Sequence, residues 1–247
     1  MEKKGFCSWL LNLLFPKHIK CVFCGKELNE NAYNDTCEDC LKNLPYISYA
    51  CARCGGPITE NNDGVCLDCK MNNYNFAKAK SALIYKDNVV RAVHKFKYNG
   101  QKFLCVPFAN LMFDELLTWD VNVDVVTNVP MFKKKEKARR YNQSTLLAKE
   151  IAEKLNVPFV EFTFKVVDNS TQTKLSYKER RENVKDVYAF NKELKPEVKG
   201  KSVLVVDDIF TTGATSDEIA KVLMKAGAKE VNVLTLAHAV VEENNKK

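Results

Sequence analysis

The chain has 247 residues, enough for one α/β domain and a smaller module, and its 46% hydrophobic content supplies a packed core. No apolar run approaches the roughly 20 residues that cross a bilayer, so stable membrane insertion is not expected. A formal net charge of +7 suits a polyanionic ligand or a nucleic acid without specifying either.

Residues 1–18 contain an apolar stretch after two lysines and are predicted to form an amphipathic helix that docks on the body of the protein. The stretch could imitate a signal peptide, but it lacks a small-residue cleavage site and leads directly into cysteine pairs. We therefore expect a cytoplasmic protein, with a membrane-surface role for this segment as the alternative.

Residues 19–72 are organised around four Cys-x-x-Cys pairs, which nearly repeat as two units and are typical of a double zinc ribbon. Two closed, structural zinc sites follow, one held by Cys21, Cys24, Cys37 and Cys40 and the other by Cys51, Cys54, Cys66 and Cys69. An interleaved ligand pairing stays open at this point, and disulfides of a secreted domain are the alternative. Few large apolar side chains lie in this region, so we expect the metal to supply much of its folding free energy.

Residues 73–241 change to alternating strands and helices, and residues 242–247 form a polar tail. Strands are expected at 81–85, 123–130, 158–164, 203–207 and 231–236, and helices at 89–96, 103–119 and 143–155. The alternation predicts an α/β fold with a parallel sheet flanked by helices. Ligands of such sheets bind at the carboxyl ends of the strands.

The segment 203–215 carries the strongest functional signal, because a buried strand runs into two acids and then into a small, hydroxyl-rich loop before a helix. Backbone N–H groups and hydroxyls at a helix N-terminus favour a phosphate. Carboxylates at a strand end can accept hydrogen bonds from sugar hydroxyls or hold a hydrated Mg²⁺. The alternative is a buried strand that ends in a solvated acidic turn.

Two further polar blocks are candidates for the same site. A basic loop follows Pro130, with six bases among residues 133–140, and Arg139 is suited to planar, bidentate phosphate contact. Residues 171–184 form a long polar connection in which Gln172, Arg180 and Asn183 are candidates for a mobile lid. The alternative for the basic loop is a solvated turn, and the alternative for residues 171–184 is a solvated helix.

The segment 203–215 resembles the motif with which type I phosphoribosyltransferases bind phosphoribosyl pyrophosphate (PRPP). The resemblance implies that Asp207 and Asp208 are a catalytic pair that contacts the ribose hydroxyls. It implies a loop that binds the 5′-phosphate, made of Thr211, Thr212, Gly213, Ala214 and Thr215. It also implies a pyrophosphate loop with basic contacts, made of Val129, Pro130, Arg139, Asn142 and Gln143.

Nearly the whole chain resembles the ComF late-competence family, in which a double zinc ribbon precedes a type I phosphoribosyltransferase domain. The cysteine pairs carry this resemblance together with Lys95-Phe96-Lys97-Tyr98, Val129-Pro130, Arg-x-Tyr-Asn-Gln, Gln172…Leu175-Ser176…Arg180…Asn183 and the PRPP motif. Two positions depart from the family pattern: Arg140 replaces a glycine, and Asn169 replaces a threonine.

The resemblance implies zinc at two structural sites, Mg²⁺ bound with PRPP, and a role in DNA uptake with single-stranded DNA and other transformation proteins as partners. Basic segments that contain Phe96, Tyr98, Phe132 and Tyr141 would suit backbone contact and base stacking. The alternatives are an active phosphoribosyltransferase with a nitrogen acceptor and a PRPP-sensing regulator. The sequence does not indicate an acceptor, so catalysis itself stays open.

Overall fold

The computed structural model describes residues 19–30, 32–168 and 183–240 and divides into two compact units, one up to Leu44 and one from Pro45 onward. The predicted helix over residues 1–18, the lid candidates Gln172 and Arg180, Asn169 and the tail 242–247 lie outside the described residues. The predicted boundary at residues 72/73 stays a prediction, and the second cysteine repeat shares its compact unit with the sheet.

The first unit is built around the first four cysteines. A tight turn over Cys21–Gly25 is closed by the Gly25 N–H, which donates to the Cys21 carbonyl at 2.8 Å. Gly25 has a φ of 77°, which only glycine adopts at little cost. Helix α2 (Glu38–Asn43) begins after Cys37 and carries Cys40, so the second pair of thiols comes from a helix N-terminus.

The second unit contains a parallel sheet with the strand order β1-β6-β5-β2, and the predicted fold class is confirmed. Its strands are β1 (Lys78–Ile84), β2 (Val125–Asn128), β5 (Ser202–Phe210) and β6 (Glu230–His238). β5 and β6 are nearly continuous runs of buried residues, as expected for strands covered on both faces. The central strands therefore form a rigid support for side chains at their carboxyl ends.

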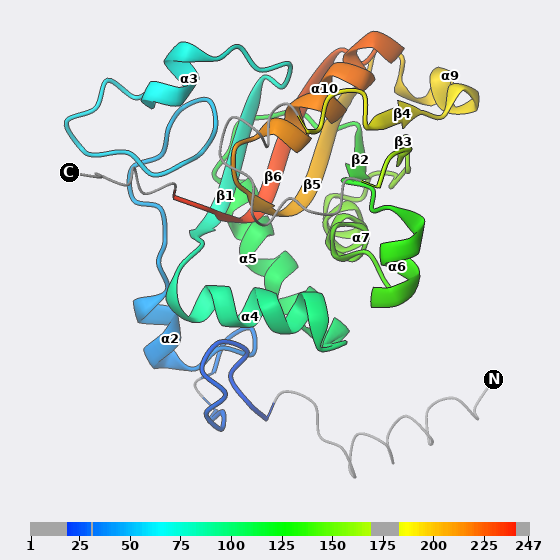
Figure 1. The fold of residues 1–247 in the computed structure, drawn as a ribbon. Helices are drawn as coiled ribbons and strands as arrows, with labels where there is room; N and C mark the ends of the chain where they lie inside the picture. Colours follow the sequence, from blue (N-terminus) through cyan, green and yellow to red (C-terminus); the bar gives the residue numbers. More distant parts are fainter. Residues whose placement is uncertain (1–18, 31, 169–182, 241–247) are drawn as a thin grey trace. The chain divides into compact units, whose positions relative to one another are not determined.

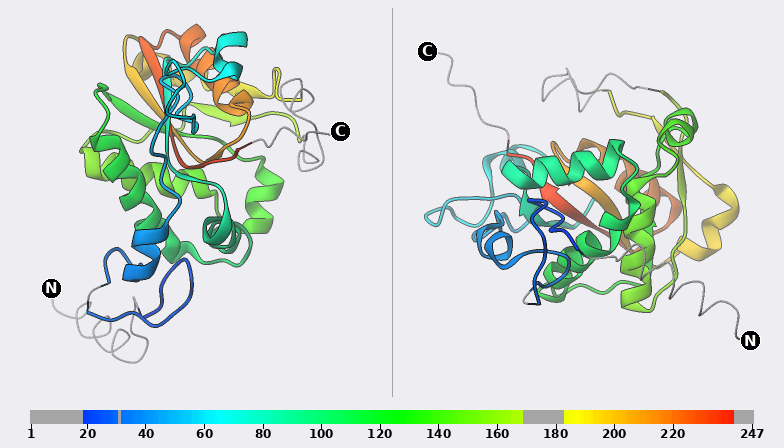
Figure 2. Two further views of the ribbon diagram at one scale, coloured as in Figure 1. Left: turned by 90° about the vertical axis from the view of Figure 1, so that its left-hand side faces the viewer. Right: turned by 90° about the horizontal axis from the view of Figure 1, so that it is seen from below.

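Helices cover both faces of this sheet (Figures 1 and 2). The helices α5 (Cys105–Leu117) and α7 (Gln143–Leu155) pack against each other and on the sheet, and α10 (Ala214–Ala226) contacts β5 and β6. The helix α4 (Asp87–Tyr98) follows β1, and the 3-10 turn η1 (Lys102–Leu104) leads into α5. Within the described ranges, no helix is both long and apolar enough to span a membrane.

The predicted strand over 158–164 is only partly present. Phe159 makes one parallel bridge to Val126, and the chain then forms β3 (Thr163–Lys165), which pairs antiparallel with β4 (Tyr188–Phe190) in a separate two-stranded sheet. The expectation of one parallel sheet was therefore wrong for this segment. Apolar alternation predicts a strand, but it does not specify which distant segment becomes the partner. After β4, η3 (Lys192–Leu194) and α9 (Lys195–Val198) lead into β5.

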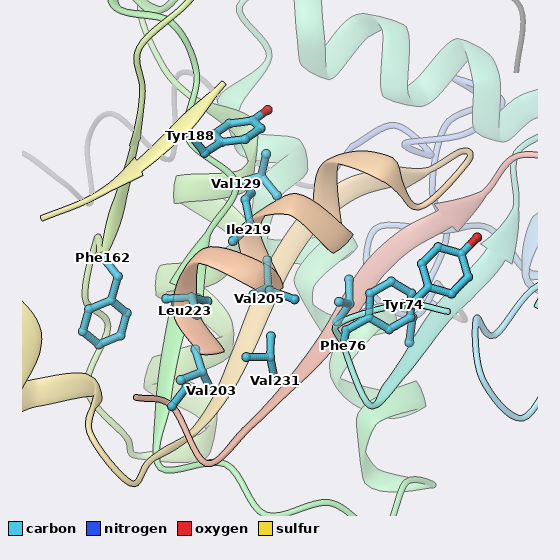
Figure 3. Packing of buried hydrophobic residues seen from close by; sticks show 14 of the residues in the cluster. Tyr74, Phe76, Val129, Phe162, Tyr188, Val203, Val205, Ile219, Leu223 and Val231 are labelled. Carbon is cyan, nitrogen blue, oxygen red and sulfur yellow. The ribbon is translucent and has the colours of Figure 1, made fainter. Parts of the chain in front are cut away.

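The hydrophobic core under α10 joins the sheet to the second cysteine repeat. Ile219 and Leu223 of α10 pack toward Val203, Val205 and Val231 of the sheet (Figure 3). The same buried cluster includes Tyr74 and Phe76 and the cysteines Cys51, Cys54 and Cys69. Helix α3 (Leu67–Met71) carries Cys69. The second metal-binding repeat is thus part of the core of the sheet-containing unit.

We predict that Gly55→Ala destabilises the protein by several kcal/mol, because a Cβ at this position would lie 2.5 Å from the Ala79 carbonyl oxygen. Gly25→Ala is the matched control: its φ is also positive, but a Cβ there meets no atom within 4 Å, and the expected cost is about 1 kcal/mol. Chemical denaturation measures the free energy of unfolding of both variants, and a chromogenic chelator detects the zinc that is released. Equal costs for the two variants would contradict the tight packing of the second repeat against β1.

Candidate functional site

The eight paired cysteines form two clusters that are suited to tetrahedral zinc. In each cluster the four sulfur atoms lie within 4.8 Å of one another, and the clusters are Cys21, Cys24, Cys37 and Cys40 and Cys51, Cys54, Cys66 and Cys69. The sulfur atoms are thus grouped as in the sequential ligand sets and not as in the interleaved pairing. All described cysteines are free of disulfide bonds. Two sulfur pairs, Cys24–Cys37 and Cys54–Cys66, are 3.6 and 3.7 Å apart, close to the roughly 3.8 Å expected between thiolates around one zinc.

Backbone N–H groups already point at sulfur atoms of the second cluster. The Gly56 N–H donates to Cys54 Sγ at 3.4 Å, and the Cys66 N–H donates to Cys51 Sγ at 3.3 Å. A hydrogen bond from the side chain of Cys54, together with the backbone N–H groups of Cys54, Cys66 and Arg53, lowers the pKa of Cys51 to about 4 against the opposing effect of burial. Such N–H···S bonds orient thiolate ligands, and the four-sulfur donor set leaves no open position for a substrate. Both zinc sites are therefore structural.

The acidic pair was expected at the end of its strand, but it lies inside β5, which continues for two residues after Asp208. β2 pairs with β5 only as far as Asn128↔Val206, whereas β6 continues to Phe210↔His238. Asp207 and Asp208 therefore occupy the step where β5 has lost its neighbour on the β2 side. The backbone on that side is not paired with β2, and the Asp208 N–H donates to Asp207 Oδ1 at 2.8 Å instead.

Both carboxylates have protein partners at this step. Asp208 is 6% exposed and forms an ion pair with Lys97 of α4, with Nζ 2.9 Å from Oδ1. Asp207 accepts a hydrogen bond of 2.6 Å from the Ser144 hydroxyl in the first turn of α7. The pKa of Lys97 is raised, because the charge and the hydrogen bond of Asp208 outweigh the opposing effect of burial. Burial, with the neighbouring Asp208 charge, raises the pKa of Asp207 to about 7.

The predicted pyrophosphate loop lies beside this acidic pair. All five of its residues line a pocket of about 160 Å³ together with Asp207 and Asp208: Val129, Pro130, Arg139, Asn142 and Gln143. Asn142 caps α7 by accepting from the Ser144 N–H at 3.1 Å and donates to the Val129 carbonyl at 2.9 Å. Arg139 donates to Gln143 Oε1 at 2.8 Å. The loop is thus held by its own amide side chains.

The basic run after Pro130 forms a short helix, α6 (Lys133–Arg139), and not the expected loop. Lys, Glu and Ala are strong helix formers, so the run is helical despite its charge. Lys135 and Arg139 are four residues apart, which places them on one helix face, and both line the pocket. Arg140 ends the helix with a φ of 69°, in the left-handed region that favours glycine. Arg140, which stands where the family has glycine, therefore keeps the left-handed backbone conformation at a cost in strain.

The predicted phosphate loop, Thr211–Thr215, connects β5 to α10. Gly213 has a φ of 70°, and a Cβ there would lie 2.6 Å from the Phe210 ring and 3.1 Å from the Tyr74 ring. The Tyr74 hydroxyl donates to the Thr212 carbonyl at 3.2 Å and also to Asp68 of α3. Asn75 donates to Asp217 in the first turn of α10 through its backbone and its side chain. The segment after the second zinc repeat therefore holds the loop from outside the sheet.

Six residues that line the pocket are not among the predicted site residues: Lys97, Met131, Phe132, Lys135, Ser144 and Lys165. Lys97 belongs to the Lys95-Phe96-Lys97-Tyr98 motif, which was predicted to contact single-stranded DNA and not to line this pocket. Ser144 directly follows the predicted Asn142-Gln143 pair, whereas Lys165 reaches the pocket from β3, whose position the sequence does not predict. Burial and the nearby Lys135 lower the pKa of Lys165, and the opposing charge of Asp168 does not outweigh them.

The aromatic residues of the basic segments differ in exposure. Phe96 is fully buried and Tyr141 is 6% exposed, so neither can stack on a base. Tyr98 is 59% exposed, and the Arg139 guanidinium lies 4.7 Å from the centre of its ring. Phe103 is also largely exposed, and it follows Lys102 in η1. An aromatic and basic surface is therefore present beside the pocket, but it is centred on Tyr98. Asn183 is the one lid candidate within the described chain and lies in a turn before β4.

Two family models match the chain: the phosphoribosyl transferase domain over residues 142–247 and the double zinc ribbon domain over residues 10–70. Competence protein F of Haemophilus influenzae is 28% identical over 228 residues, which cover 90% of this chain and 98% of that protein. DNA utilization protein YhgH of Escherichia coli (strain K12) is 27% identical over an alignment that covers 83% of this chain and 90% of that protein. Competence protein ComFC of Bacillus subtilis (strain 168) is 26% identical over an alignment that covers 81% of this chain and 82% of that protein.

We predict that Asp207→Asn stabilises the ligand-free protein by about 1–3 kcal/mol at pH 8. A carboxyl whose pKa is raised by folding binds its proton more tightly in the folded state, so its contribution to stability falls as pH rises from about 4 to 7. The variant lacks this loss and keeps an oxygen for the Ser144 hydroxyl. Urea unfolding between pH 5 and 8 measures the difference, which should grow with pH. A difference that is zero at every pH would contradict the raised pKa.

Proposed function

Because this chain belongs to the ComF family, we propose that it is a PRPP-binding protein that acts in DNA uptake and natural transformation by handling single-stranded DNA. The family assignment is supported by the double zinc ribbon, the phosphoribosyltransferase domain and relatives that align over most of their length. The names of these relatives connect them to competence and DNA utilization. The observation that carries the PRPP part is the cationic pocket around Asp207 and Asp208.

The pocket has the charge distribution that PRPP requires. Four cations line it, namely Lys97, Lys135, Arg139 and Lys165, against the two carboxylates. In the proposed complex, Asp207 and Asp208 accept hydrogen bonds from the ribose hydroxyls, and Arg139 contacts the pyrophosphate. Bound with PRPP, Mg²⁺ would neutralise pyrophosphate charge. Thr211–Thr215 offer hydroxyl and backbone donors to the 5′-phosphate at the start of α10.

Lys97 has a separate role in this proposal. In the ligand-free protein it pairs with Asp208 at 2.9 Å and so allows this buried acid to lie beside the half-buried Asp207. When ribose hydroxyls bind the acids, the same ammonium group remains within the pocket as a counter-charge for the anionic ligand. If pyrophosphate leaves from C1 of ribose, the residues act by orienting PRPP and stabilising charge, because such a centre needs electrostatic stabilisation more than proton transfer.

Single-stranded DNA would bind at the surface that contains Tyr98, Lys102, Phe103 and Arg139, for two reasons. Two largely exposed aromatic rings offer faces on which bases can stack. The neighbouring cations offer contacts to the phosphate backbone. Arg139 both lines the PRPP pocket and lies over the Tyr98 ring, so this surface and the pocket share a residue. Binding of PRPP and of DNA would therefore affect each other.

We predict that Asp208→Asn weakens Mg²⁺-PRPP binding at least a hundredfold, because it removes a hydrogen-bond acceptor for ribose and leaves Lys97 without its partner. Isothermal titration calorimetry measures the affinity of the zinc-loaded protein. Asp120→Asn is the matched control, since Asp120 is exposed and does not line the pocket, and its affinity should equal that of the wild type. Retained affinity in Asp208→Asn would refute the PRPP site.

We predict that Tyr98→Ala weakens binding of a single-stranded oligonucleotide by about tenfold, because one base–aromatic stack contributes about 1–3 kcal/mol. Fluorescence anisotropy at low and moderate salt measures this change and the salt dependence of the wild type. Tyr33→Ala, at an equally exposed tyrosine in the other unit, is the control. No binding by the wild type even at low salt would contradict the DNA part of the proposal.

A further inference from the structure

Tyr74 is held by both halves of the second zinc cluster. Arg53, in the turn of the first cysteine pair of this cluster, donates from Nη2 to the Tyr74 carbonyl at 2.8 Å. The Tyr74 hydroxyl donates to Asp68 of α3, which lies between the two cysteines of the second pair. The Tyr74 ring stacks on Phe76 at 4.6 Å between ring centres (Figure 3). The backbone and the hydroxyl of Tyr74 therefore each depend on one half of the zinc site.

Zinc would fix these two partners of Tyr74 relative to each other. The helix α3 has five residues, which are too few for a stable helix in water. The turn that contains Arg53 is closed by the Gly55 N–H, which donates to the Cys51 carbonyl at 2.9 Å. Small sites of four thiolates gain much of their folding free energy from the metal. Loss of zinc would therefore release Arg53 and Asp68 from their observed positions around Tyr74.

The same hydroxyl also fixes a peptide group of the proposed phosphate loop, because it donates to the Thr212 carbonyl at 3.2 Å. No cis peptide bond is present among the described residues, and a trans peptide directs its N–H away from its carbonyl. With the Thr212 carbonyl held by Tyr74, the Gly213 N–H points away from Tyr74 at the start of α10. A backbone N–H at a helix N-terminus is a suitable donor to a phosphate.

A packing contact connects the same cluster to the same loop. A Cβ at Gly213 would lie 2.6 Å from the Phe210 ring, and this ring stacks on His238 at 4.9 Å between ring centres. The imidazole of His238 lies against Gly56, where a Cβ would be 2.6 Å from its Nε2 and 3.3 Å from Cys54 Sγ. Phe210 and His238 therefore connect a zinc-binding turn to the loop by direct contact, in addition to the hydrogen bonds described above.

Building on the proposed PRPP site, we propose that zinc in the second cluster and the 5′-phosphate of PRPP bind with positive coupling, and that Tyr74 is the positioning residue that carries it. Zinc fixes the two partners of Tyr74, and Tyr74 orients the peptide between Thr212 and Gly213 for the 5′-phosphate. Coupling between two sites is reciprocal, so PRPP in turn stabilises zinc in this cluster. The first cluster belongs to the other compact unit, and its zinc is outside this coupling.

The first test measures zinc release from the full-length, zinc-loaded protein by excess chromogenic chelator, with and without Mg²⁺-PRPP. The first cluster should lose zinc faster, because Cys24 is exposed and Cys37 is half-buried, whereas three thiols of the second cluster are buried. Cys24→Ser should remove the fast phase and so assign the two phases. Saturating Mg²⁺-PRPP should slow the second phase by roughly fivefold or more, and should leave the first phase within about twofold.

The second test uses Tyr74→Phe, which removes the hydroxyl and keeps the ring that stacks on Phe76. The dissociation constant of Mg²⁺-PRPP, measured by calorimetry, should rise about tenfold, and PRPP should no longer slow zinc release from the second cluster. The dissociation constant of Mg²⁺-pyrophosphate, which has no 5′-phosphate, should stay within about twofold, whereas misfolding would weaken both ligands. Tyr49→Phe, at a 48% exposed tyrosine beside the same cysteine repeat, should change none of these values.

Three results would overturn the coupling: PRPP binds the wild type but slows neither phase or both phases equally, Tyr74→Phe binds PRPP like the wild type, or Tyr74→Phe weakens PRPP and pyrophosphate alike. Zinc release from the wild type needs no variant, so it decides the question even if Tyr74→Phe is unstable. Failure of the proposed function looks different, because Mg²⁺-PRPP would then not bind to the zinc-loaded wild type. In that case the coupling falls together with the PRPP site.

Discussion

The functional region depends on two neighbouring carboxylates, the buried Asp208 and the half-buried Asp207, at the point where β5 extends beyond the end of its pairing with β2. Two acids placed together in this way repel each other and resist ionisation unless other groups compensate. Lys97 provides the opposite charge for Asp208, and the Ser144 hydroxyl donates to Asp207. Both partners come from helices that pack near the carboxyl ends of the sheet. The acids are therefore held ready for a ligand that brings hydroxyl donors and cations of its own, and the ligand-free protein gives up stability to keep them there.

The second zinc repeat contributes to the same region through contacts that a separate module would not make. Its turn approaches β1 so closely that the Ala79 N–H donates to the Arg53 carbonyl at 2.7 Å. Tyr74 connects Asp68 of this repeat with the carbonyl of Thr212 in the phosphate loop. Phe210 stacks on His238 and, together with Tyr74, closes the space beside Gly213. Zinc at this site therefore supports the loop as well as the ribbon, whereas the first cluster belongs to the other compact unit.

Much of this arrangement could be predicted from local sequence patterns. The helix Gln143–Leu155 was predicted with its observed bounds from its helical pattern, and the structure adds that Asn142 caps it. Cysteine spacing predicted both zinc clusters. The pairing of Lys97 with Asp208 could not be predicted, because it joins residues far apart in sequence and depends on how α4 packs. The antiparallel β3–β4 pair depends on tertiary pairing in the same way. Burial of Phe96 and Tyr141, together with exposure of Tyr98, shows that composition alone does not identify the stacking residue.

The most direct test of this account is a ³¹P NMR titration of Mg²⁺-PRPP with the zinc-loaded protein at pH 8, where Asp207 is ionised. The account predicts that the 5′-phosphate and pyrophosphate resonances both shift or broaden at equimolar protein, because each phosphate has its own loop beside the acidic pair. Resonances that stay unchanged with protein in excess would contradict it, since a pocket with these charges would then not be a PRPP site.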